Sequence, residues 1–165
     1  MLIEKDIHIA VITEHWLKEV IANKFLVQDF LLTTHFSRKD GYGGVLIFSS
    51  KELCVEEISQ TKDFSVEGLL EMNAIWEKRL KTVVIAVYRL PEGSFEVFME
   101  NMKAGLDEIN QLNINHVHIH VAGDFNVDLM KSCTRTDDIL ELGIWTTSQI
   151  YGTLQNHRYF PDFDR

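Results

Sequence analysis

Val121-Ala122-Gly123-Asp124-Phe125-Asn126-Val127-Asp128 is an apolar strand pattern that leads directly into a carboxylate and a carboxamide. The residues from His116 to Ala122 alternate and are rich in β-branched side chains, which predicts a strand. Gly123 allows a close backbone turn, so Asp124 and Asn126 are expected to project together. A carboxylate can hold a hard cation or take a proton from water, and an amide can hydrogen-bond a phosphate oxygen. The alternative is a plain turn, in which Asp and Asn bond to their own main chain.

Three earlier segments carry related patterns. Ile9 to Trp16 is an apolar strand ending on Glu14, Gly41 to Ser49 is a strand led by glycines, and Val83 to Pro91 is a strand with Tyr88 near its end. In this order, and together with Gly-Asp-Phe-Asn, they resemble the endonuclease/exonuclease/phosphatase family. Three motifs are most similar to those of the family branch found inside non-LTR retrotransposon polyproteins: Thr-Glu-His-Trp-Leu, Val-Tyr-Arg-x-Pro and Gly-Asp-Phe-Asn-Val-Asp. The resemblance covers most of the chain and fades toward its end.

The resemblance implies an α/β (α+β) fold of two packed β-sheets flanked by helices, a DNase I-like four-layer sandwich. The pattern of elements agrees. The clearest helix is predicted from Phe95 to Leu112, where apolar residues recur at helical spacing and Ser94 is a candidate N-cap. It leads into the strand ending at Asp124, as a crossover packed on a sheet would, and a shorter helix is expected from Thr134 to Leu142. With 165 residues and 45% hydrophobic content, residues 1–165 are expected to form a single domain.

The resemblance also assigns roles to individual residues. Glu14 matches the metal-binding glutamate of the family, and the implied cofactor is Mg²⁺ or Mn²⁺. Asp124 matches the aspartate that positions or deprotonates the attacking water, and Asn126 the asparagine that steadies this water and the phosphate. Tyr88 matches a tyrosine near the scissile phosphate, where a phenol can donate to developing charge. Arg89 is expected either to contact DNA phosphate or to be solvated. The plain alternatives are a solvated acid for Glu14 and a half-buried strand tyrosine for Tyr88.

Two parts of the family pattern do not occur in the sequence. The family begins with a strand that carries an asparagine and ends with a Ser-Asp-His segment, so we expect a domain truncated at both ends. His157 lacks the preceding aspartate and follows Gly-Asp-Phe-Asn too soon to take that role. General acid–base partners are often worth about 10² to 10⁴ in rate. The sequence therefore predicts a Mg²⁺-dependent, DNA-nicking endonuclease domain, with a catalytically dead remnant or binding module, or a phosphatase of the same family, as alternatives.

Charge and composition limit the partners. The chain has 25 acidic and 16 basic residues, a net charge of −9, which argues against tight nonspecific DNA binding. A bound Mg²⁺ would still invert the local field of an acidic cleft. Two cysteines, Cys54 and Cys133, without a signal sequence or a bilayer-spanning segment predict an intracellular protein of the nucleus or cytoplasm and no membrane partner. The expected partners are DNA and, in the parent polyprotein, a reverse transcriptase region.

Three histidines raise a different possibility. His116, His118 and His120 occupy alternate positions of the predicted strand and would share one face, as in a transition-metal site. Along a strand, however, the three would spread over about 13 Å, too far for one tetrahedral ion. An exposed or polar sheet face is the alternative. The sequence has no phosphate-binding Gly-x-x-x-x-Gly-Lys, no dinucleotide fingerprint and no Gly-x-Ser-x-Gly elbow.

Overall fold

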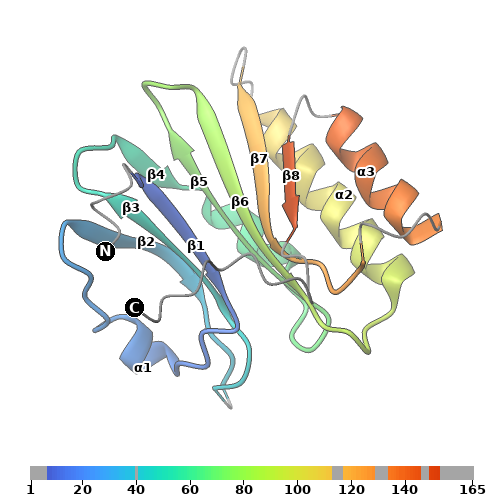
Figure 1. Ribbon diagram of the computed structural model, residues 1–165, viewed down its shortest axis with the longest axis horizontal. Helices are drawn as coiled ribbons and strands as arrows, with labels where there is room; N and C mark the ends of the chain where they lie inside the picture. Colours follow the sequence, from blue (N-terminus) through green and yellow to red (C-terminus); the bar gives the residue numbers. More distant parts are fainter. Residues whose placement is uncertain (1–6, 40, 113–116, 129–133, 146–148, 153–165) are drawn as a thin grey trace, which may run out of the picture.

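Two β-sheets lie face to face, and helices cover the outer side of one of them (Figure 1). The computed structural model describes residues 7–39, 41–112, 117–128, 134–145 and 149–152. The strands are β1 (Ile9–Thr13), β2 (Phe30–Phe36), β3 (Val45–Ser50), β4 (Val55–Glu57), β5 (Leu70–Glu77), β6 (Thr82–Arg89), β7 (His118–Asp124) and β8 (Gln149–Gly152). The helices are α1 (Glu19–Ala22), the short 3-10 helix η2 (Ser59–Phe64), α2 (Phe95–Gln111) and α3 (Thr134–Trp145). The predicted class, two packed sheets flanked by helices, is confirmed.

Sheet A is antiparallel, and β3 lies at its centre between β1 and β2. Val45 and Ile47 of β3 are buried between the two sheets. Leu46 and Phe48 alternate with them and are buried on the opposite, outer face. The predicted glycine-led strand therefore forms, but it begins at Val45 and not at Gly41, because the glycines before it have positive φ angles outside the β region.

Sheet B has the order β4-β5-β6-β7-β8 and combines an antiparallel β5–β6 hairpin with parallel β6–β7 and β7–β8 pairs. The α2 helix connects β6 to β7, as predicted for a crossover. Ser94 caps α2, since its side chain accepts a hydrogen bond from the Val97 N–H at 3.3 Å. The helix buries Phe98, Met102 and Ile109 against the outer face of sheet B. Each such burial contributes roughly 1.5–3 kcal/mol to folding.

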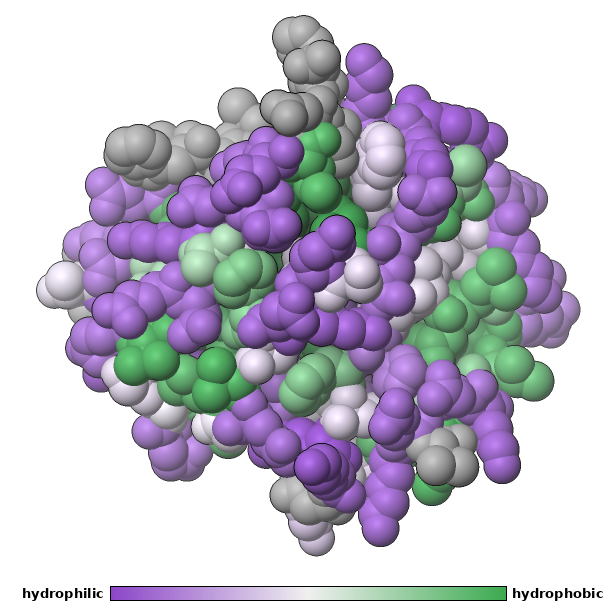
Figure 2. All heavy atoms as spheres, turned by 180° about the vertical axis from the view of Figure 1, so that it is seen from behind, coloured by the Kyte–Doolittle hydropathy of each residue, from purple (hydrophilic) through white to green (hydrophobic). Residues whose placement is uncertain are grey.

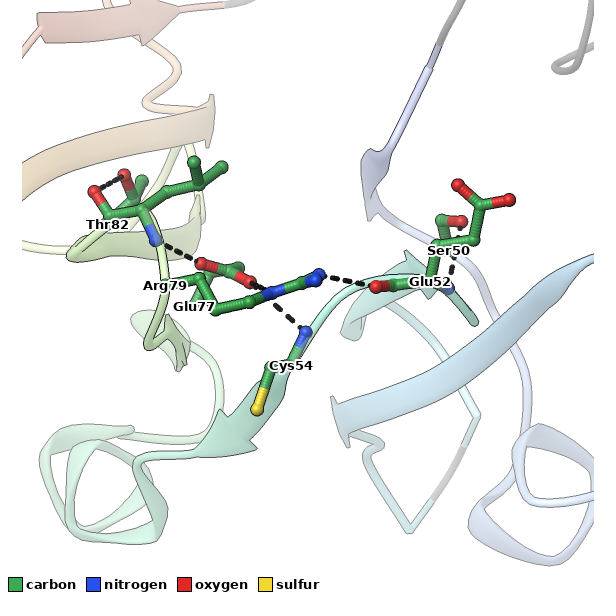
Figure 3. A network of polar contacts seen from close by, with 7 residues as sticks. Ser50, Glu52, Cys54, Glu77, Arg79 and Thr82 are labelled. Atoms are coloured by element: carbon green, nitrogen blue, oxygen red, sulfur yellow. Dashed lines mark hydrogen bonds and ion pairs between the residues drawn. The ribbon is translucent and has the colours of Figure 1, made fainter.

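A buried carboxylate ties together the hairpin end of β5 and β6 (Figure 3). Glu77 accepts hydrogen bonds from the backbone N–H groups of Cys54 at 3.1 Å and Leu80 at 2.5 Å. Arg79 forms an ion pair with Glu77 at 3.3 Å and donates to the carbonyl of Glu52. Burial alone would raise the pKa of Glu77, but these hydrogen bonds and the Arg79 charge bring it below its ordinary value. The network fastens the hairpin turn to the segment between β3 and β4.

The outer face of sheet A is only partly covered. Phe25, which follows α1, packs its ring 6.0 Å from that of Phe48 but remains exposed. Ile12 and Leu26 are also exposed. Figure 2 views the molecule from behind Figure 1 and shows a largely hydrophilic surface with a hydrophobic patch on the right, the side of sheet A. The described residues thus build three layers: sheet A, sheet B and the α2–α3 layer. On the outer face of sheet A they supply only α1 and the segment after it.

Candidate active site

A row of polar side chains crosses sheet B near one end of its strands. Tyr88 of β6 is paired with Glu71 of β5 and with Asp124 of β7. Paired residues project from the same face of a sheet, and Tyr88 belongs to the apolar cluster between the sheets. The exposed fractions are only 0% for Glu71, 5% for Tyr88 and 6% for Asp124. The row therefore brings together Tyr88 and Asp124, as expected, and adds Glu71, which the sequence did not single out.

Glu14 reaches this row from sheet A, immediately after β1. The Tyr88 hydroxyl donates a hydrogen bond to Glu14 Oε1, so one bond links the ends of the two sheets. Glu14 is exposed and has a φ of 52°, a left-handed conformation that non-glycine residues adopt rarely and often at functional sites. Burial, the hydrogen bond to Glu14 and the charge of Glu14 all raise the pKa of Tyr88 above its ordinary value. The phenol therefore stays protonated and serves as a hydrogen-bond donor.

An ion pair supports the row from the other side. Arg38, between β2 and β3, donates from Nε to Glu71 Oε1, and the Gly44 N–H donates to Glu71 Oε2 at 2.6 Å. The guanidinium carbon of Arg38 lies 6.0 Å from the centre of the Tyr88 ring. Burial raises the pKa of Glu71, and the Arg38 and Gly44 contacts offset part of that rise. Arg38 thus places one positive charge beside both Glu71 and Tyr88.

The glycines before β3 allow two side chains to approach the backbone closely. Gly43 and Gly44 have φ angles of 84° and 93°. A Cβ on Gly43 would collide with the Arg38 guanidinium, and one on Gly44 would collide with the His15 ring. His15 donates from Nε2 to the Phe36 carbonyl at 2.9 Å and accepts at Nδ1 from the Leu17 N–H at 2.9 Å. An imidazole that accepts at one nitrogen is neutral, in agreement with a pKa lowered by burial.

Asp124 and Asn126 form the turn that follows β7. The Asn126 backbone N–H donates to Asp124 Oδ1 at 2.9 Å, and the Asn126 side-chain amide donates to the Arg89 carbonyl at 2.6 Å. Asn126 has a φ of 49°, which Asn tolerates better than most residues. A Cβ on Gly123 would collide with the Val87 carbonyl, so the expected close backbone approach is present. The bonds of a plain turn are therefore made, and they hold Asp124 in the polar row.

Arg89 lies on the other face of sheet B, and this corrects the expectation that it contacts DNA phosphate or is solvated. Its exposed fraction is 1%. The guanidinium donates to the carbonyls of Gly93 at 2.7 Å and Asn126 at 3.4 Å. It also lies over the rings of Phe95 and Phe98, at 5.6 and 5.8 Å from their centres. Arg89 therefore ties the loop before α2 to the Asn126 turn.

The surroundings of Glu14 fit a Mg²⁺ ligand. Mg²⁺ takes one or two carboxylates and keeps several waters, and Glu14 combines an exposed carboxylate with the Tyr88 contact that brings it to the row containing Asp124. Within the described part of the chain, no group of three or more His, Cys, Asp or Glu is arranged to hold a metal ion. Glu14 would thus be the principal protein ligand, and Asp124, which is paired with Tyr88 on the neighbouring strand, is a candidate for a second.

Two of the three strand histidines can be placed. His118 and His120 lie on the face of β7 that carries Asp124, and His116 lies outside the described residues. His118 is exposed, and His120 is partly buried. Burial and the neighbouring His118 both lower the pKa of His120, which favours its neutral form. These placements do not test the possibility of a metal site on this strand.

A surface groove between α2 and α3 lies on the opposite side of sheet B from the polar row. Its lining includes Lys103, Asp107, Asp138 and Glu141. Three carboxylates against one ammonium group make it a poor place for a phosphate anion. The polar row with Glu14 is therefore the better candidate for phosphate chemistry.

Comparisons with known proteins support the fold. No protein-family model and no curated protein matches the chain. Among solved structures, it is similar to "Endonuclease domain of TRAS1, a telomere-specific non-LTR retrotransposon", with a TM-score of 0.59 and 13% sequence identity. The match covers 88% of this chain and 61% of that chain, so this chain spans about three fifths of the length of the structure it matches. At this identity the likeness establishes a fold: two packed sheets with helices, like that of a retrotransposon endonuclease domain.

Proposed function

We propose that this chain is an endonuclease-type phosphodiesterase domain of a retrotransposon-derived protein, which nicks DNA with the help of Mg²⁺ or Mn²⁺. The observation that carries the proposal is the contact between Glu14 and Tyr88 beside Asp124. An exposed carboxylate, a protonated phenol and a buried aspartate are the groups needed to hold a cation, stabilise developing charge and activate water. They occur in a fold similar to that of a retrotransposon endonuclease domain.

Each residue has a role that its surroundings support. Glu14 would hold the ion, which, when bound, neutralises charge on the phosphate. Asp124 would position the attacking water and accept its proton, because the Asn126 turn fixes one of its oxygens. The Asn126 amide has a second N–H, which would donate to a phosphate oxygen. The Tyr88 hydroxyl would turn from Glu14 to a phosphate oxygen when substrate is present.

One observation favours a second candidate, a folded domain with little or no hydrolytic activity. His15 adjoins Glu14 in the sequence, but both of its ring nitrogens are bonded to main chain. It therefore cannot serve as a proton donor or acceptor without breaking these bonds. Since an acid–base partner is often worth about 10² to 10⁴ in rate, a site built from Glu14, Tyr88, Asp124 and Asn126 alone would cleave slowly.

The setting of the proposed activity is inside the cell, in the nucleus or cytoplasm, and beside a reverse transcriptase region of a parent polyprotein. None of the helices in the described segments combines the length and the apolar character needed to cross a bilayer. The DNA substrate and the retrotransposon context are proposed from the similar fold and from the motifs around Glu14 and Asp124.

Incubation of the purified chain with supercoiled plasmid and Mg²⁺ or Mn²⁺ tests the proposal. We expect slow conversion to nicked circles by the wild type and by Asp107→Asn, an exposed carboxylate on α2, and none by Glu14→Gln or Asp124→Asn. No nicking by the wild type above the Glu14→Gln level would establish the inactive domain instead. Release of phosphate from small phosphoesters without nicking would assign the site to a phosphatase of the same fold.

A further inference from the structure

Two exposed aromatic rings stand beside the candidate active site. Trp16 follows Glu14 by two residues, and Tyr42 precedes Gly44 by two residues. Their exposed fractions are 62% and 64%, and their ring centres lie 6.2 Å apart in an edge-to-face arrangement. Single exposed hydrophobic residues are ordinary on protein surfaces. A pair of large exposed rings in contact with each other is less ordinary. Here the two loops that carry the rings also contribute residues to the candidate active site.

The backbone presents these rings in a defined position. The Trp16 N–H donates to the Gly43 carbonyl at 2.9 Å, which joins the two loops directly. Trp16 has a φ of 55° and Gly41 one of 84°, so each loop contains a residue in the left-handed region. A bulky residue such as tryptophan rarely adopts that conformation. Gly43 packs against the Arg38 guanidinium. The rings are thus attached to loops that the candidate site itself holds in place.

A lysine side chain lies beside the loop that carries Tyr42. The side chain of Lys18 runs along Gly41, where an added Cβ would lie 3.2 Å from Lys18 Cγ and 3.7 Å from Lys18 Cε. Lys18 is exposed. In a chain with a net charge of −9, a lysine beside the loop that carries one of two exposed rings suits an anionic ligand with flat, apolar groups.

We propose that Trp16, Tyr42 and Lys18 form a platform that binds single-stranded nucleic acid by stacking an unpaired base on the rings and pairing a backbone phosphate with the lysine. This inference rests on the proposed function and specifies its substrate: a strand with an unpaired base next to the phosphate at Glu14. Base stacking on aromatic side chains is the common device of proteins that bind single strands. In a duplex the bases are stacked on each other, so little base surface is available to stack on these rings.

Binding measured without cleavage tests the platform. The full-length chain, in EDTA and at low ionic strength, is titrated into fluorescein-labelled oligothymidylate of about twelve nucleotides, within the site size of such binders. An abasic strand of the same length and the corresponding duplex serve as the comparison probes, and fluorescence anisotropy gives Kd. The variants are Trp16→Ala, Tyr42→Ala and Lys18→Ala. Leu80→Ala, which truncates an exposed hydrophobic residue on the β5–β6 turn, is the matched control.

We expect oligothymidylate to bind at least about tenfold more tightly than the abasic strand, and Trp16→Ala and Tyr42→Ala each to weaken that binding about 5- to 20-fold. Trp16→Ala and Tyr42→Ala should change the affinity for the abasic strand less than about twofold. Lys18→Ala should weaken binding of both strands by the same factor, and Leu80→Ala should weaken binding of neither. Equal affinity for the two strands, or equal losses on both in Trp16→Ala, would overturn the platform. Circular dichroism of each variant excludes unfolding as the cause, and Trp16→Phe should bind as the wild type does.

Failure of the platform and failure of the proposed catalysis give different results. Base-dependent binding by a chain that does not nick plasmid keeps the platform and removes the hydrolysis. Nicking by a chain that binds the abasic strand equally well removes the platform and keeps the hydrolysis.

Discussion

At the scale of single residues, the bond from Tyr88 to Glu14 has two consequences. It keeps the phenol protonated, since burial and the Glu14 carboxylate both raise the pKa of Tyr88. It also holds Glu14 close to a row that already contains Asp124 and Glu71. Before substrate or metal is present, Glu14 is thus a hydrogen-bond acceptor near the buried row, and the charge that would bind a cation is already in position.

We expect Tyr88→Phe to lower the nicking rate about 10²-fold, because removing one donor aimed at developing negative charge has an effect of that size. Stability should fall by only about 0.5–1.5 kcal/mol, the usual net worth of a hydrogen bond, since the ring still packs between the sheets. Plasmid nicking and urea unfolding measure the two quantities. Asp107→Asn alters an exposed side chain on α2 and should leave both unchanged. Wild-type nicking by Tyr88→Phe would show that the hydroxyl has no catalytic role.

Arg38→Ala should destabilise the protein by about 3–5 kcal/mol, because it leaves the buried Glu71 carboxylate without its cation. The pKa of Glu71 is already raised by burial, and loss of Arg38 raises it further. A carboxyl group with a raised folded-state pKa binds its proton more tightly when folded, so stability falls as the pH rises above the ordinary glutamate pKa of about 4.3. Urea unfolding of the variant at two pH values, near 5 and near 7, should show this slope more steeply than the wild type.

The double variant Arg38→Ala with Glu71→Gln separates charge from packing. Because the substituted glutamine side chain carries no charge to desolvate, we expect the double variant to be more stable than Arg38→Ala at neutral pH and to lose the added pH dependence. A double variant that is no more stable would mean that Arg38 acts through its contacts with Gly43 and Tyr88 instead.

The family resemblance assigned Tyr88 and Asp124 to one site, and they are paired on neighbouring strands, but the expectation for Arg89 was wrong. Neighbouring residues of a strand point to opposite faces, so Tyr88 and Arg89 could not both reach one site, and this signal was available in the sequence. Arg38 and Glu71 carried no comparable signal. A glutamate in an apolar strand does not reveal its partner, because the partner is 33 positions away and meets it only through the packing of two sheets.

At the scale of elements, regular periodicity decided what could be predicted. The α2 helix and its Ser94 cap were recognisable, because one apolar stripe recurs over its whole length. The segment from Val66 to Trp76 fits a strand or a helix equally by pattern. Its part from Leu70 onward becomes β5, because β4 and β6 pair with it. β8 has only four residues, too few for a pattern, and it forms by adding to the open edge of β7.

Glu77 shows how a single side chain can secure such elements, and it gives a pH-dependent prediction. Glu77→Gln should cost about 1–3 kcal/mol at neutral pH, because the Cys54 and Leu80 donors lose a charged acceptor. The pKa of Glu77 is lowered in the folded state, so its contribution is complete above the ordinary glutamate pKa and is lost as the pH falls through the folded value. The difference in unfolding free energy between wild type and variant should therefore shrink between about pH 6 and pH 3.

The matched control is Glu67→Gln, since Glu67 is exposed in the turn before β5. Its unfolding free energy should stay within about 0.5 kcal/mol of the wild type across the same range. A constant difference between wild type and Glu77→Gln at all pH values would show that shape, and not the negative charge, is what the network needs.

At the scale of the whole molecule, the candidate site depends on how the two sheets are packed. Sheet A supplies Glu14 and, from the loop before β3, Arg38 and Gly44, whereas sheet B supplies Glu71, Tyr88 and Asp124. The apolar cluster between the sheets, which includes Ile47 of sheet A and Tyr88 itself, sets their spacing. The larger cluster on the other side of sheet B joins it to α2 and contributes no residue to the site.

Two isoleucines therefore make a matched pair. Ile47 lies between the sheets and Ile85 lies under α2, and both are fully buried in sheet strands. Ile47→Val and Ile85→Val should each cost about 0.5–1.5 kcal/mol, measured by urea unfolding. We expect Ile47→Val to slow nicking several-fold more than Ile85→Val under conditions in which both are folded, because a misplacement of about 1 Å between reacting groups can cost 10²-fold in rate. Equal slowing at equal stability would mean that spacing between the sheets does not control the site.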